Sequence, residues 1–152
     1  MVRRFEIVFV KDGTVIPAEL LEDKAPLSCE AFWEGIQVPH RDKIHHGGET
    51  GPELWCFVPK PKEDLPYENS TVFPEHGDIL FYHYIQPPTR AGKMVYDIGI
   101  YYDRGCSKLK QGWIAGNLFA RVANREDIAR LRKIAGRLLQ EGPEDVLLRR
   151  KA

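Results

Sequence analysis

The sequence predicts a mainly β protein, a closed or nearly closed antiparallel β-barrel of about eight strands with two helices. Three observations carry this prediction. Short segments rich in β-branched and aromatic residues recur along the chain, one helical pattern comes early and one late, and no composition shift marks a linker within residues 1–152. Apolar residues make up 43% and charged residues 29%, which is typical of a single globular domain with one core.

The first half of the chain is predicted to begin with a hairpin and a helix. Apolar and polar residues alternate over 5–10, Asp12-Gly13 supplies a turn, and an extended run follows. Pro26 suits a helix start, and apolar residues can share one helical face over 26–36. The strands expected in this half cover residues 5–10, 15–21, 43–46 and 54–58.

The second half is predicted to add the clearest helix. Apolar residues recur at helical spacing from Ile128 to Leu138, Asn124 is the expected N-cap, and Gly142-Pro143 ends the pattern. The strands expected here cover residues 79–84, 94–102, 118–122 and 146–148, with a turn region at Pro87-Pro88 and a polar turn over 105–111.

Charge and composition exclude several classes of function. The 22 basic and 22 acidic residues cancel, so we expect neither nucleic acid nor an acidic membrane surface as a partner. No apolar run approaches the ~20 residues of a membrane span, and the N-terminus has no leader pattern. Cys29, Cys56 and Cys106 are odd in number and widely spaced, which fits reduced thiols. These features indicate a cytoplasmic protein.

Three segments resemble the cyclophilin-like barrels. They are the run Gly13–Phe32, in which a strand ending in Glu-Leu precedes a Pro and a helix with a Phe, the opening Pro74–Asp78, and the strand Gly116–Val122 followed by a helix. The resemblance implies a cyclophilin-like domain over residues 1–152, most similar to bacterial cyclophilin-like families of unknown function. Because the motifs are short, they inform on the fold more than on activity.

Active cyclophilins place a Phe-His-Arg segment, a Phe and a Gln-Gly-Gly-Asp around their catalytic arginine. The corresponding segment here is Pro39–Glu49. Its residues are more closely spaced than in the active cyclophilins, it lacks the Phe, and His46 replaces the Gln. Arg41 is the one residue that the resemblance carries over as a catalytic arginine. The sequence therefore departs from the residue pattern of a peptidyl-prolyl isomerase.

The histidine- and glycine-rich segment after the first helix is the expected ligand site. His46 is predicted to transfer a proton or donate a hydrogen bond, with Glu49 and Cys56 as catalytic partners. His45 and Trp55 are predicted to contact the ligand. His45, His46, Glu49 and Glu53 are residue types that bind metals, but adjacent strand residues point to opposite faces, so both histidines could reach one ion only where the backbone is irregular. No metal site is therefore predicted, and a metal-binding cupin is a minor alternative. The alternatives are a polar surface loop for the histidines and a core thiol for the cysteine.

Tyr101 and Asn117 are predicted to orient the ligand. Tyr101 shares one strand face with Asp97 and Asp103, which forms a polar stripe, and Tyr82 and Tyr84 likewise share a face. The alternative for the polar stripe is a solvated outer surface.

We therefore expect a barrel-side groove that binds a small polar molecule and needs no cofactor. The alternatives are a small amide or lactam hydrolase, or a subunit of one, and more weakly a prolyl isomerase. The exposed aromatic residues and Leu147-Leu148 favour a homo-oligomer, although barrel closure could use the same leucines.

Overall fold

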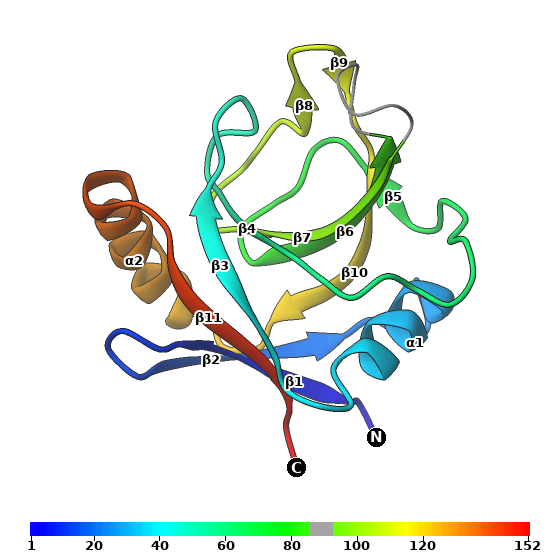
Figure 1. Ribbon diagram of the computed structural model, residues 1–152, viewed down its shortest axis with the longest axis horizontal. Coiled ribbons are helices and arrows are strands. Elements are labelled where there is room, and N and C mark those ends of the chain that lie inside the picture. Colours follow the sequence, from blue (N-terminus) through cyan, green and yellow to red (C-terminus); the bar gives the residue numbers. More distant parts are fainter. Residues whose placement is uncertain (86–92) are drawn as a thin grey trace.

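The computed structural model describes residues 1–85 and 93–152, and the turn expected at Pro87-Pro88 lies outside them. Within these ranges eight antiparallel strands close into a barrel in the order β2-β1-β11-β3-β4-β7-β6-β10, and β2 pairs with β10 to complete the ring (Figure 1). The strands are β1 (Arg4–Phe9), β2 (Thr14–Leu20), β3 (His40–His46), β4 (Glu53–Phe57), β6 (Asp78–Ile85), β7 (Met94–Tyr101), β10 (Gly116–Val122) and β11 (Glu144–Arg150). The expected closed barrel is confirmed.

The short strand β5 (Ser70–Thr71) adds to the edge of β10, and β8 (Lys108–Leu109) pairs with β9 (Gly112–Trp113) in a separate hairpin. This hairpin occupies the segment that the sequence predicted to be a polar turn. β3 is also longer than expected, because residues from His40 onward pair with β11. Cross-strand pairing thus extends a segment whose own composition is typical of a loop.

Helix α1 (Pro26–Gly35) matches its prediction and begins at the proline. Its buried residues include Cys29 and Phe32, and the Phe32 ring meets Phe119 of β10 edge to face with centroids 5.0 Å apart. The aromatic contact fixes the helix against the barrel, since edge-to-face pairs add to the energy of apolar burial.

Helix α2 (Asp127–Glu141) lies on the other side of the barrel from α1 (Figure 1). Its apolar face is buried, as the spacing predicted, and the chain turns away at Gly142. The expected N-cap is wrong: the residue before the helix is Glu126, and the Asn124 side chain instead donates to Asp127 Oδ2 at 3.2 Å. No described side chain caps this helix.

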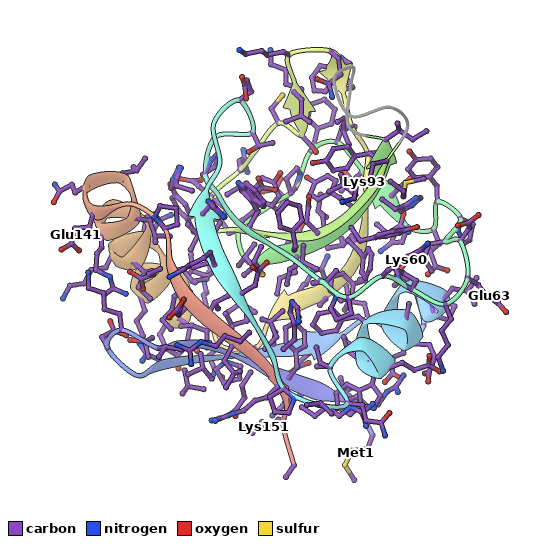
Figure 2. The ribbon with its side chains drawn as sticks, in the orientation of Figure 1. Met1, Lys60, Glu63, Lys93, Glu141 and Lys151 are labelled. Atoms are coloured by element: carbon purple, nitrogen blue, oxygen red, sulfur yellow. The ribbon has the colours of Figure 1, made fainter. Side chains whose placement is uncertain are left out.

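Inward-facing apolar side chains fill the barrel, as Figure 2 shows. They come from every second position of the strands and include Phe5, Ile7, Phe9, Ile16, Ile44, Leu54, Cys56, Ile79, Phe81, Ile98, Ile100, Phe119, Val146 and Leu148. Leu148 lies in this core, so that end of the chain closes the barrel. No helix of the described residues is long and apolar enough to cross a membrane.

The outer face of β4, β7 and β6 is also covered. Leu80, Tyr82 and Tyr101 point outward there and form a second buried cluster with Ile114 and Leu118. The cover comes from the segment that holds β8 and β9, which Figure 1 shows above these three strands. This second buried layer positions the candidate site.

Candidate functional site

A cavity of about 280 Å³ lies on the outer face of β4, β7 and β6. Its lining residues come from the end of β3 and the following loop (His46–Thr50), from β4 (Glu53, Trp55), from β6 (Tyr82, Tyr84), from β7 (Asp97), and from the covering segment (Ser107–Leu109, Ile114). The register explains this convergence, because β4 pairs with β7 from Glu53↔Tyr101 to Phe57↔Asp97 and Tyr82 of β6 lies opposite Asp97.

Glu53 is 4% exposed and faces the cavity. The Thr50 hydroxyl donates to its Oε1 at 2.8 Å, and the Tyr101 hydroxyl, from the residue opposite Glu53 in the strand register, is the second hydroxyl that acts on the pKa of this carboxyl. Room for the carboxyl comes from Gly99, where an added Cβ would collide with Glu53 Oε2, and from Gly47, where it would lie 3.1 Å from Oε1. Burial raises the pKa of the Glu53 carboxyl to about 7, and the two hydroxyls oppose that rise where they donate.

Asp97 is the second buried carboxyl in the cavity, at 5% exposure. Burial and, next, the negative charge of Glu53 raise the pKa of Asp97 well above its usual range. The Tyr84 hydroxyl donates to Asp97 Oδ2 at 3.3 Å, whereas Oδ1 has no hydrogen-bond partner among residues 1–85 and 93–152. Neither carboxyl forms an ion pair within those residues, whose salt bridges all join other acidic and basic groups.

A chain of hydroxyl groups runs beneath the carboxyls. The Tyr101 and Tyr82 oxygens are 2.7 Å apart, the Tyr82 and Ser107 oxygens are 2.6 Å apart, and Ser107 donates to the Ile114 carbonyl at 2.6 Å. Burial raises the pKa of both tyrosines, which therefore stay protonated. The chain links β7 and β6 to the segment that covers the cavity.

The expected catalytic residues have different positions. His46 borders the cavity, but both ring nitrogens are occupied: Nδ1 donates to the Gly47 carbonyl at 2.7 Å, so Nε2 of the neutral ring accepts from the Tyr102 hydroxyl at 2.6 Å. Glu49 lies exposed at the rim. Cys56 lies in the barrel core, where burial raises the pKa of its thiol. Strand alternation places it on the opposite face of the sheet from His45, which pairs with Trp55.

Of the four residues expected to contact or orient the ligand, some line the cavity and others do not. Trp55 lines the cavity, and His45 stacks on the Trp55 indole with centroids 4.4 Å apart but is not itself in the lining. Tyr101 is fully buried and acts within the hydroxyl chain. Asn117 is in the interior, where its amide donates to Ser28 Oγ and the Pro66 carbonyl. It joins α1 and the 66–69 segment to β10 and is not among the residues that line the cavity.

Sequence reasoning missed the carboxyl pair, although part of its signal was present. Asp97, Tyr82 and Tyr84 were assigned to polar strand faces, but a solvated surface was the alternative for such faces. Glu53 begins an otherwise apolar strand, which is the signal that could have identified it. Among the described residues no group of three or more His, Cys, Asp or Glu side chains could hold a metal ion.

Arg41, the residue carried over from the cyclophilins, lies on the outside of β3. It is exposed and pairs with Asp145 of β11, 2.7 Å away. The cavity lining does not include it. The geometry therefore gives no support to prolyl isomerisation through this arginine.

Comparison with known proteins agrees with the fold. A family model described as a protein of unknown function (DUF3830) matches residues 7–149. No curated protein matches the chain. A solved structure, described as McbB in complex with tryptophan, superposes with a TM-score of 0.72 at 19% identity, over 97% of this chain and 45% of that one. This likeness shows that the fold is cyclophilin-like, and the chain spans less than half the length of that protein.

Proposed function

Since the chain belongs to the DUF3830 family, whose function is unknown, we propose from its geometry that it binds a small polar molecule in the cavity on β4, β7 and β6. One observation carries the proposal. Two buried carboxyl groups, Glu53 and Asp97, face the same cavity without an ion-pair partner among the described residues. Asp97 lines this cavity, and its Oδ1, which accepts no hydrogen bond from a described residue, is free to accept one from a ligand.

The rest of the lining supports a ligand with an apolar part. The Trp55 indole, Leu109 and Ile114 provide apolar surface, while the carboxyls and the Tyr84 hydroxyl provide polar contacts. A mainly apolar wall with a few converging polar groups is typical of small-molecule sites. The structural neighbour was solved with tryptophan, which makes this amino acid a reasonable first probe here.

The proposal is tested by calorimetric titration with L-tryptophan, benzamide and benzylamine. We expect at least one probe to bind, and the changes Asp97→Asn and Glu53→Gln to weaken it by about 10-fold or more, because each alters a buried hydrogen-bonding group. Glu63→Gln is the matched control, since Glu63 is exposed outside this cavity. Equal affinity in all four proteins, or binding by none of the probes, would contradict the proposal.

Amide or lactam hydrolysis is the second candidate. It is favoured by one observation: a carboxyl whose pKa is raised to about 7 lies next to a second buried carboxyl, and such a pair can exchange protons with a substrate near neutral pH. Release of benzoate from benzamide, lost in Glu53→Gln, would favour the enzyme over the binding protein.

A cytoplasmic location and self-association remain proposals. Phe73 and Trp113 are 63% and 58% exposed and pack edge to face beside the β8–β9 hairpin, which gives an apolar surface for a second copy. Light scattering that finds only monomer at high concentration would contradict self-association.

A further inference from the structure

The hydroxyl groups that line the cavity already direct their protons at other protein atoms. Thr50 donates to Glu53 Oε1 at 2.8 Å, and Tyr84 donates to Asp97 Oδ2 at 3.3 Å. Ser107 donates to a backbone carbonyl at 2.6 Å. A hydroxyl group has one proton to donate, so these three side chains have none left for a ligand.

Tyr82 is the remaining hydroxyl side chain of the described lining, and its proton is also in use. Its oxygen lies 2.7 Å from that of Tyr101 and 2.6 Å from that of Ser107, so the proton is bonded to one of these two. The lining therefore offers a ligand acceptor oxygens. One of them is Asp97 Oδ1, which accepts no hydrogen bond from a described residue. A ligand that suits this lining must itself donate.

The two carboxyl groups stand on the same face of β7. A Cβ on Gly99 would collide with Glu53 Oε2, so the Glu53 carboxyl occupies the space above Gly99. Asp97 precedes Gly99 by two residues, and side chains two residues apart on a strand point to the same face at a spacing of about 7 Å. A single ligand group with N–H bonds in more than one direction is thus placed to contact both carboxyls.

The charge of the lining favours a cation. Glu53 and Asp97 are 4% and 5% exposed, and neither has an ion-pair partner among residues 1–85 and 93–152. The basic side chains in the lining are His46 and Lys108. His46 is neutral when one ring nitrogen donates and the other accepts, and Lys108 is exposed, where water and salt screen its charge. Two buried carboxylates would therefore lack a buried positive charge.

We propose that the ligand of this cavity is a small organic cation, a primary amine or a guanidine, whose charged group lies between Glu53 and Asp97 and whose apolar part lies against Trp55. The inference rests on the proposed binding function and narrows it to one class of ligand. Ammonium and guanidinium groups carry several N–H donors and no acceptor, which matches the oxygens that the lining presents. The volume of about 280 Å³ limits the apolar part to one ring or a short chain.

The apolar wall distinguishes an organic cation from a metal ion. Trp55, Leu109 and Ile114 line the same cavity as the carboxyls, and His45 stacks on the Trp55 indole with centroids 4.4 Å apart. An indole attracts a cation that lies near its face, and the aliphatic side chains pack against the apolar part of an amine. A bare metal ion would leave this apolar surface uncovered.

Binding of a cation should release a proton. In the empty cavity, burial raises the pKa of Glu53 to about 7, and burial and then the negative charge of Glu53 raise the pKa of Asp97. An ammonium group favours the ionised carboxyls, so it replaces a proton, and its affinity should rise about 10-fold from pH 6 to pH 8. The other titratable side chains around the two carboxyls are His46 at the end of β3, Glu49 in the following loop, Tyr82 and Tyr84 on β6, Tyr101 on β7 and Lys108 on β8.

The test is calorimetric titration with three probes of similar shape and different charge, namely benzylamine, benzyl alcohol and benzoate. At pH 8 benzylamine should bind about 10-fold more tightly than benzyl alcohol, and benzoate should bind more weakly than either. Titrations at pH 6 in buffers of different ionisation enthalpy count the protons released. We expect about one proton per benzylamine bound and none for benzyl alcohol.

Substitutions locate the charged contact. Asp97→Asn keeps the shape of the side chain and removes its charge, so it should weaken benzylamine by about 10-fold or more at pH 8 and benzyl alcohol by less than about 3-fold. Glu53→Gln should also flatten the dependence of benzylamine affinity on pH. Lys108→Gln should strengthen benzylamine about 2-fold, because it removes a like charge from the lining. Glu63→Gln, an exposed acid outside this cavity, is the matched control.

The outcomes separate the ligand class from the binding function. Benzyl alcohol or benzoate that binds as tightly as benzylamine, or benzylamine that binds without releasing protons, would overturn the cation while leaving a binding site in this cavity. Both measurements use the wild-type protein and need no variant to fold. Equal weakening of benzylamine and benzyl alcohol in Asp97→Asn would overturn the charged contact. Binding by none of these probes, nor by tryptophan or benzamide, would overturn the proposed function and this inference together.

Discussion

The two faces of β4, β7 and β6 are both buried, but by different means. The inward face carries apolar side chains that pack in the barrel, namely Leu54, Cys56, Ile79, Phe81, Ile98 and Ile100. The outward face carries polar and aromatic side chains beneath a covering segment, namely Glu53, Trp55, Tyr82, Tyr84, Asp97 and Tyr101. Residues adjacent in sequence thus belong to two environments, one that stabilises the barrel and one that suits a ligand.

A side chain can therefore be excluded from water without belonging to the hydrophobic core of the barrel. Phe81 and Tyr82 are neighbours on β6 and are both buried. Phe81 belongs to the apolar core and packs edge to face against Phe119, whereas Tyr82 forms hydrogen bonds with Tyr101 and Ser107. Substitutions on each face and a change of pH test this contrast between the two faces.

The largest effect is expected from truncating the inward face. Phe81→Ala should lower the free energy of unfolding by about 3–5 kcal/mol, because it leaves a cavity in the packed barrel. Tyr84→Ala, on the outward face of the same strand, should cost less than half as much and should instead weaken ligand binding. Urea denaturation of both variants measures the two changes in the free energy of unfolding. Equal losses of that free energy would show that the two faces contribute equally to stability.

A smaller effect is expected from the pH dependence of the outward face. Glu53 binds its proton more tightly in the folded state than in the unfolded state, since burial raises its pKa from 4.5 to about 7. Stability is therefore lost as the pH rises from about 4.5 through about 7, by up to about 3 kcal/mol. Glu53→Gln should remove the contribution of Glu53 to that loss, so unfolding free energies measured at pH 5 and pH 8 should differ less in the variant than in the wild type. A wild-type stability that does not fall over this range would contradict the raised pKa.

The smallest effect is expected from filling the space beside the carboxyl. In Gly99→Ala the new methyl group collides with Glu53 Oε2 and approaches Tyr82, so we expect a loss of about 1–3 kcal/mol and weaker ligand binding. Gly136→Ala is the control: it lies in α2 with no atom within 4 Å of the new methyl group, and it should stabilise the protein by about 0.5–1 kcal/mol. Chemical denaturation and ligand titration of both variants measure these effects. Unchanged stability and unchanged ligand affinity in Gly99→Ala would contradict the prediction.

Local patterns were enough to predict the barrel. Alternation marked the β1–β2 hairpin, and helical spacing marked α2, because both patterns are set by residues close in the chain. The cap at Asn124 was wrong because the helix begins only at Asp127, so Glu126 directly precedes it and the Asn124 amide donates to the Asp127 carboxyl. The cyclophilin-like fold was predicted from the resemblance of three short segments, and the order of the elements agrees with it.

The candidate site was predicted only in part. The segment after the first helix does reach the cavity through His46 and Glu49, as expected. The carboxyl pair depends on the register between β4 and β7, which places Glu53 opposite Tyr101 and two positions from Gly99 on the neighbouring strand. Such a register is set by long-range packing, so the sequence around Glu53 does not contain it. The same packing directs Cys56 and Asn117 into the interior.

The pairing of β1 with β11 has a consequence for how the chain folds. Phe5 lies opposite Arg150, and Figure 1 shows the two ends of the chain leaving the barrel side by side. Bringing together segments this far apart in sequence costs loop-closure entropy before their contacts stabilise the fold. This cost slows folding. During synthesis, β4, β6 and β7 leave the ribosome before β11 does. The ring can close only after β11 emerges, so the outward face of these strands must remain without a completed barrel behind it until that moment.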